Sequence, residues 1–206
     1  TAPAGGDITI SSAIDNSSNN NNLTLVAGED VSIFAAVTMG SSGDLTINAG
    51  QRSDINSGAV LATAAITAND LVVTADTGIT IINAVVDTMD LTINQTGGIN
   101  VSNTKAFQLS SNTNNNNFTA STSSGNISLS SINAGTGDVV LTSSLGSILD
   151  ADVSSDTTVN VIADSLTLVS KTGIGASGTN GDLDTNVATL VPSVSDSGSL
   201  IITDTS

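Results

Sequence analysis

The chain has 206 residues, of which 19 are acidic and three are Lys or Arg, so its formal net charge is −16. It contains no Cys, His, Trp or Tyr. Such a polyanion repels phosphate backbones and anionic lipid, which argues against binding to nucleic acid or to a membrane surface. No stretch approaches the ~18 continuous apolar residues of a membrane span, and the lack of Cys excludes a disulfide framework.

The composition favours a narrow, turn-rich structure. Aromatic residues make up 1% of the chain, so Val, Ile, Leu and Ala must fill the interior. Mean hydropathy is +0.24, and the apolar residues are regularly spaced, so the charge does not imply disorder. Glu29 is the only Glu among the acids, and Asp favours turns where Glu favours helices.

Short segments with apolar residues at every second position follow one another along the chain, which is the strand period. Small polar turns separate them, and no window favours a helix because Asn, Ser, Thr, Gly and Val are poor helix formers. In chain order, the expected strands contain Leu23/Leu25, Val31/Ile33, Val37/Met39, Leu45/Ile47, Leu71/Val73, Ile79/Ile81, Leu91/Ile93, Ile99/Val101, Phe107/Leu109 and Leu200–Ile202.

A motif of the form Asp-Leu-Thr-Ile-Asn recurs along the chain, as in residues 43–48, 69–74 and 89–94. Its copies are about 20 to 27 residues apart, which is the period range of solenoids. The sequence therefore predicts an all-β, right-handed parallel β-helix of about eight coils, each of three short strands. Coils that stack at about 4.8 Å would form a rod roughly 40 Å long. The anchor residues of the repeats are Leu23, Leu45, Leu71, Leu91, Phe118, Val139, Val159 and Leu183.

No domain boundary is visible, so residues 1–206 are expected to form a single solenoid. Residues 171–199 are the least regular stretch, and their many Gly and Ser residues suggest an irregular insertion between two coils. The Asn runs 19–22 and 114–117 each precede an anchor strand. We interpret them as turns, in which Asn tolerates left-handed backbone, in preference to prion-like segments.

The Asp residues that open the repeats are candidate metal ligands. They are expected to lie along one corner of the solenoid, with Asn22 and Asn117 in equivalent positions. Carboxylates about 5 Å apart repel one another, and a row of Ca²⁺ ions would relieve that repulsion. The favoured alternative is that each Asp caps its turn by accepting backbone N–H bonds. The candidates are Asp44, Asp70, Asp90 and Asp138.

Catalysis is the weakest functional hypothesis, and the chain is predicted not to be an enzyme. Some parallel β-helices cleave acidic polysaccharides with clustered Asp and a nearby cation. Asp150 and Asp152 would place two carboxylates on one face of a strand. The cations Arg52, Lys105 and Lys171 are far apart in sequence, and the lack of His, Cys and Tyr removes most general acids and bases.

Two further surface functions have weak support. Ice binding would need a Thr-x-Thr array on one face of most coils, whereas this chain has single Thr residues mixed with Ser, Asn and Val. N-glycosylation sequons arise by chance in such a composition and show only that the modification is permitted. They occur at Asn16, Asn22, Asn94, Asn100, Asn117 and Asn126.

Residues 6–11 (GDITIS), 22–31 (NLTLVAGEDV) and 43–50 (GDLTINAG) resemble the repeats of filamentous haemagglutinin-type proteins. The resemblance covers most of residues 6–170. It implies a bacterial cell-surface or secreted β-helix adhesin, exported through an outer-membrane partner, with an extracellular structural or adhesive role. It also implies that the chain is a segment of a repeat region, but it specifies no ligand and carries over no catalytic residue. Host or surface glycans are candidate partners for such an adhesin.

The ends of a β-helix expose unpaired backbone, which natural solenoids protect with helices or loops. Neither Thr1–Gly6 nor Thr203–Ser206 is suited to form such a cap. The chain therefore either continues in the intact protein or stacks end to end with identical copies into a filament.

Overall fold

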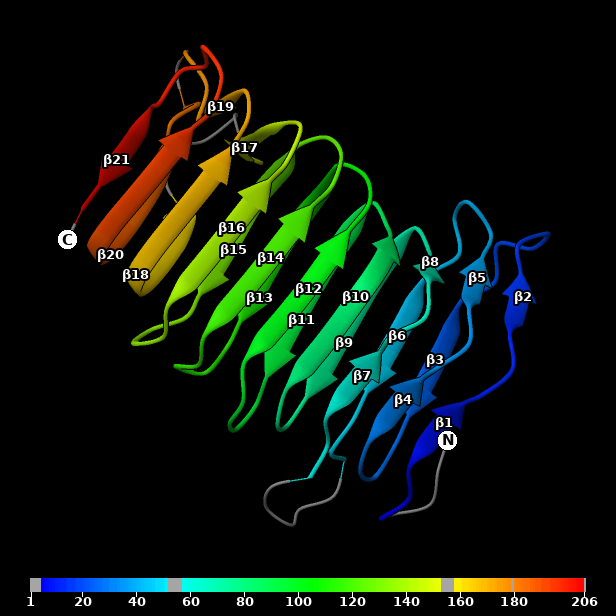
Figure 1. Cartoon of the computed structure of the whole chain (residues 1–206). Helices are drawn as coiled ribbons and strands as arrows, with labels where there is room; N and C mark the ends of the chain where they lie inside the picture. Colours follow the sequence, from blue (N-terminus) through cyan, green and yellow to red (C-terminus); the bar gives the residue numbers. More distant parts are fainter. Residues whose placement is uncertain (1–4, 52–56, 153–157, 179, 206) are drawn as a thin grey trace.

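The computed structural model describes residues 5–51, 57–152, 158–178 and 180–205. All 21 strands in these ranges pair in parallel and form one sheet wound into a solenoid of about nine turns. Figure 1 shows the chain advancing along one axis, with β1 and β21 at opposite ends. The described ranges contain no α-helix, and so none that could cross a membrane. The predicted all-β parallel solenoid is confirmed.

Face 1 is a continuous row of parallel strands that crosses all nine turns. It consists of β1 (Ile8–Ile10), β4 (Val31–Ile33), β7 (Val60–Ala62), the start of β10 (Ile79–Val85), β12 (Ile99–Asn103), β14 (Phe118–Thr122), β16 (Val139–Ser143), the end of β18 (Val161–Ser170) and the end of β20 (Leu183–Val194).

Face 2 begins with three short strands and then merges with face 1. Its first strands are β2 (Ile14–Asn16), β5 (Val37–Met39) and β8 (Ile66–Thr67). β8 pairs with the end of β10, and from there the last residues of β10, β12, β14, β16, β18 and β20 continue the row. The first coils thus have three short strands, as predicted, and the later coils have two longer ones.

Face 3 closes each turn of the solenoid. It consists of β3 (Leu23–Val26), β6 (Leu45–Asn48), β9 (Asp70–Ala75), β11 (Thr88–Ile93), β13 (Phe107–Asn112), β15 (Ile127–Asn133), β17 (Ser147–Asp150), the start of β18, β19 (Gly173–Ile174), the start of β20 and β21 (Ile202–Asp204).

The core follows from the alternation of side chains along each strand. In β6, Leu45 and Ile47 are fully buried, while Thr46 between them faces outward and is half-buried. Parallel pairing in register stacks equivalent residues, as with Leu23, Leu45 and Leu71. Each inward side chain is therefore covered by its counterparts in the neighbouring coils, so a thin interior becomes dry without large aromatic residues.

The interior row of face 2 changes from apolar to polar along the rod. It begins with Ile14, Val37, Ile66 and Ala84, continues with Asn103, Thr122, Ser143 and Ser170, and ends at the apolar Val194. The four polar members are all buried. This change coincides with the merging of faces 1 and 2, because the turn that follows each merged strand needs partners for its backbone groups.

Three of these four buried side chains are satisfied by turn backbone. The Asn103 Nδ2 donates to the carbonyls of Val86 and Lys105, both at 3.0 Å, and Thr122 Oγ1 donates to Lys105 O at 2.8 Å. Ser143 Oγ donates to Gly125 O at 2.8 Å. Ser170 differs, because its Oγ is buried and has no hydrogen-bond partner among the described residues.

The described residues of the stretch 171–199 continue the solenoid through two strands. It contains β19 and all of β20, whose 12 residues make it the longest of the described strands. β20 pairs with β18 in register from Val161↔Thr185 to Ser170↔Val194. The sequence pattern missed this regularity because the alternation is blurred: Thr185 is buried in the interior, whereas Val191 faces outward and is exposed.

Candidate functional site

The four Asp residues predicted as one row lie in three different places. Asp44 and Asp70 occupy equivalent positions on face 3, because the residues that follow them, Leu45 and Leu71, are paired. Asp44 directly precedes β6, and Asp70 is the first residue of β9. Asp90 pairs with Val72, so it lies two residues further along its strand, and Thr88 occupies the position equivalent to Asp70. The expectation of one continuous carboxylate row is therefore wrong.

Asp138 belongs to another side of the solenoid. It directly precedes β16 on face 1, and its neighbour in the preceding coil is Asn117. Copies of the Asp-containing motif lie on face 3 in some coils and on face 1 in others, because the number of residues per coil varies. Paired residues on face 1 are 29 positions apart between Val31 and Val60, but 19 apart between Val60 and Ile79.

These side chains act as caps between coils. Asn22 Oδ1 accepts the backbone N–H of Asp44 at 3.0 Å, and Asp44 Oδ1 accepts that of Asp70 at 3.3 Å. Asp70 Oδ1 accepts the hydroxyl of Thr88 at 2.8 Å. On face 1, Asn117 Oδ1 accepts the N–H of Asp138 at 3.0 Å. Among the four candidate Asp residues, the capping of a backbone N–H expected from the sequence is therefore seen for Asp44, and the capped group lies one coil further along. The equivalent caps at the other two corners come from Asn22 and Asn117.

Within the described part of the chain, no three acidic side chains gather in a way that would hold a metal ion. The argument for a Ca²⁺ row rested on an even line of carboxylates, which the register does not produce. Arg52, one of the three cations considered in the sequence, lies outside the described residues.

The Asn run 114–117 ties three coils together. Asn114 and Asn115 both have left-handed backbone, with φ of 50° and 65°, as expected for Asn in a turn. The Asn114 Nδ2 donates to Asn94 O at 2.7 Å in the preceding coil, and Asn115 Oδ1 accepts the N–H of Thr136 at 3.3 Å in the next.

A hollow of about 350 Å³ opens on face 3 where the sheet splits. β15 pairs with β17 through residues 127–129 and with the start of β18 through residues 132–133, so its two ends have different partner strands. Asp150 and Asp152, which the sequence placed on one face, both line this hollow. The full lining is Gln108, Ser130, Asp150, Ala151, Asp152, Thr158 and Asn160.

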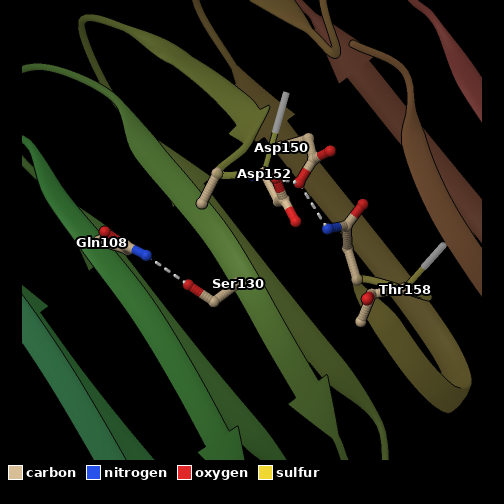
Figure 2. A pocket seen from close by; sticks show the side chains of 7 residues that line it. Gln108, Ser130, Asp150, Asp152 and Thr158 are labelled. Atoms are coloured by element: carbon tan, nitrogen blue, oxygen red, sulfur yellow. Dashed lines mark hydrogen bonds between the residues drawn. The ribbon is translucent and has the colours of Figure 1, made fainter. Parts of the chain in front are cut away.

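Figure 2 shows how this hollow is built, with Gln108 and Ser130 on one side and Asp150, Asp152 and Thr158 on the other. The Gln108 Nε2 donates to Ser130 Oγ at 2.6 Å. Asp150 Oδ1 accepts the side-chain amide of Asn160 at 2.8 Å and the backbone N–H of Asp152 at 2.9 Å. These bonds fix the buried carboxylate of Asp150 at the rim of the split.

A second hollow of about 310 Å³ lies beside the first. Gln108 and Ser130 line both hollows, so the two form one polar groove along face 3. The remaining lining of the second hollow is Asp70, Val72, Thr88, Met89, Asp90 and Ser110. Two of the predicted metal candidates, Asp70 and Asp90, therefore face this groove. No local sequence pattern marks Gln108, Ser130 or Asn160, because they come together only where β15 pairs with two different strands.

The lining of the groove is acidic and contains no cation. None of the described lining residues of either hollow is Lys or Arg. Lys105 Nζ instead contacts Asp87 Oδ1 at 2.7 Å on the exposed surface, where such a pair contributes little to stability. Away from the groove, the side chain and backbone of Ser17 donate hydrogen bonds that lower the pKa of Asp15.

Comparison with known proteins finds no matching family model, no matching curated protein and no matching solved structure.

Proposed function

We propose that this chain is a non-enzymatic structural and adhesive rod, a segment or subunit of a bacterial cell-surface or secreted β-helix protein. The observation that carries the proposal is the nine-turn parallel solenoid, whose core continues without a break along its axis. Such a core keeps a thin chain straight and presents a long surface from a small number of residues. The resemblance to filamentous haemagglutinin-type repeats supports the extracellular location.

The outer surface suits such a rod. Its outward positions carry mostly short polar side chains, as with Thr9, Ser32, Thr80, Asn100 and Thr119 along face 1. The net charge of −16 keeps neighbouring rods apart and soluble.

The residue inventory supports a non-catalytic role. The chain has no His, Cys or Tyr, so general acid–base chemistry would fall to carboxylates and to Lys105 and Lys171. Asp150, the most enclosed carboxylate of the groove, already accepts two hydrogen bonds from Asn160 and Asp152. Such a carboxylate is held as a structural acceptor.

Adhesion is tested with beads that carry the folded chain and are applied to epithelial cells and to immobilised extracellular matrix. Beads with heat-unfolded chain are the control. The proposal predicts retention of the folded beads only. Equal retention of both bead types, or of neither, would contradict the adhesive role and leave a purely structural one.

A self-assembling filament is the second candidate. It is favoured by interior residues at both ends that pack on the core but remain only half-buried, namely Ile8 and Ile14 at one end and Leu190 and Val194 at the other. A second copy stacked end to end would cover these side chains. Electron microscopy of the isolated chain distinguishes long uniform fibres from single short rods.

A further inference from the structure

The two hollows of the groove on face 3 share Gln108 and Ser130 and have a largely polar lining. We propose that this groove binds an uncharged oligosaccharide laid along the axis of the solenoid. This inference rests on the proposed adhesive function and names the ligand class through which adhesion would occur.

The length of the groove fits a chain of sugars better than a single sugar. Its lining residues come from five strands in succession, β9, β11, β13, β15 and β17. With coils spaced about 4.8 Å apart, the first and fifth strands are about 19 Å apart. The two hollows, of about 350 and 310 Å³, meet at Gln108 and Ser130. An extended ligand would therefore contact both hollows and cross these two residues at its centre.

The lining offers the hydrogen-bonding groups that hydroxyl-rich ligands need. Sugar hydroxyls both donate and accept, and the groove supplies both functions through the amide of Gln108 and the hydroxyls of Ser110 and Ser130. Carboxylates such as Asp90 accept from hydroxyls in short, charge-assisted bonds. Asp90 is exposed, and its side chain makes no hydrogen bond to the described residues, so its acceptor oxygens face solvent.

The charge of the groove selects against anionic glycans. Asp70, Asp90, Asp150 and Asp152 line it without any Lys or Arg among the described residues. A sulphated, sialylated or uronic acid chain would bring like charges close together and would be repelled.

The same lining does not form a cage for a cation. Among the described residues, no three acidic side chains are placed so that they could hold one metal ion. Asp70 Oδ1 and Asp150 Oδ1 already accept hydrogen bonds from Thr88 and Asn160. The carboxylates instead stand at the two ends of the groove with neutral amides and hydroxyls between them, an order that fits an uncharged polar chain.

The test is binding of the full folded chain to a printed array that holds neutral glucose and galactose oligomers, sialylated and sulphated glycans, and cationic chitosan oligomers. Two groove variants, Gln108→Ala and Asp90→Ala, remove exposed side chains and leave the core intact. Thr119→Ala on face 1 is the matched control, since it removes an exposed hydroxyl on another side of the solenoid. Loss of one hydrogen bond corresponds to a fall in affinity of about fivefold.

We expect binding to neutral oligomers, with about fivefold weaker binding for each groove variant and unchanged binding for Thr119→Ala. Binding to no neutral oligomer, a preference for anionic or cationic glycans, or equal binding by groove variants and control would each overturn the proposal. If beads carrying the chain adhere to cells while the array shows no neutral ligand, the groove inference fails and the adhesive rod stands. If both fail, the adhesive function falls as well.

Discussion

The side-chain oxygen of Asn117 accepts a hydrogen bond from the backbone N–H of Asp138, which lies 21 residues further along the chain, at 3.0 Å. Similar contacts recur between Asn22 and Asp44 and between Asn126 and Ser147. Each of these Asn side chains accepts a hydrogen bond from a backbone N–H at a corner. At a corner the chain passes from one face to the next, and the backbone hydrogen bonds between strands are interrupted. Corner Asx residues thus serve the stacking of coils.

Substitution Asn117→Ala should remove this bond and lower the free energy of unfolding by about 1 kcal/mol, the net value of a typical hydrogen bond. Urea unfolding followed by circular dichroism measures the change. Asn117→Asp is the matched control, because it keeps an acceptor oxygen and should stay close to the parent. An alanine variant as stable as the aspartate variant would show that the corner bond contributes nothing.

Ser143 and Ser170 occupy equivalent buried positions and should respond in opposite ways to the same substitution. Ser143 Oγ donates to Gly125 O and accepts from Gly146 N, so Ser143→Ala should destabilise the chain by about 1–3 kcal/mol through unsatisfied backbone groups. Ser170 Oγ has no partner among the described residues, so Ser170→Ala should be neutral or stabilising. Unfolding midpoints of the two variants compare them directly, and equal losses would refute the assignment.

Phe118 is the largest fully buried side chain, stacked between Ile99 and Val139 in the interior row of face 1. Phe118→Ala should cost about 3–5 kcal/mol, because the neighbouring coils cannot collapse into the cavity. The adjacent outward substitution, Thr119→Ala, should change stability by less than about 0.5 kcal/mol. Thermal unfolding provides the comparison, and a mild effect of the Phe118 substitution would mean that the interior is loosely packed.

Pro192 lies where it reduces the ability of the unpaired edge of β20 to form hydrogen bonds with another strand. The Ser195 N–H donates back to Ser170 O at 3.0 Å. Because N–H groups of a strand point to alternate sides, the nitrogen of Pro192 faces the opposite edge, where β20 has no partner for residues 189–194 among the described strands. A proline at this position removes one donor from that edge.

Pro192→Val should therefore strengthen end-to-end association by about fivefold, the value of one added hydrogen bond. Sedimentation velocity at several concentrations measures it. Ser193→Val is the control, since the Ser193 N–H faces β18 and the substitution adds no edge donor. Identical sedimentation of the two variants would mean that this edge takes no part in assembly, which would also count against the filament candidate.

Alternating apolar residues were sufficient to predict most strands. The pairs Leu45/Ile47 and Ile79/Ile81 lie in β6 and β10 with their side chains buried. Alternation also placed Asp150 and Asp152 on the same side of the chain, and both line one hollow. These features depend only on neighbours in sequence, which is why the sequence reveals them.

The alignment of coils could not be predicted in the same way. Leu91 was aligned with Leu71, yet it pairs with Val73, and Met89 pairs with Leu71. A short motif of Asx followed by an apolar strand suits every corner of the solenoid, because each corner needs a cap before the next strand. Motif spacing therefore cannot tell which face a copy occupies when coil length changes.

The groove was equally hidden from the sequence. It exists because the register shifts in β15 after Leu129 and because β15 is shared between β17 and β18. Gln108 and Ser130 become neighbours only through that pairing, and nothing in their local sequence marks them as a site.

The central claim is that equivalent residues stack along one axis at a constant rise. The chain has no Cys, so nitroxide labels can be placed at chosen outward positions of face 1. Thr9 and Asn100 are four coils apart, and Thr9 and Thr167 are seven coils apart. Pulsed electron–electron double resonance on the two double-cysteine variants should give narrow distance distributions centred near about 19 Å and about 34 Å, at about 4.8 Å per coil. Distances that do not increase with the number of coils, or broad distributions in both variants, would contradict the solenoid.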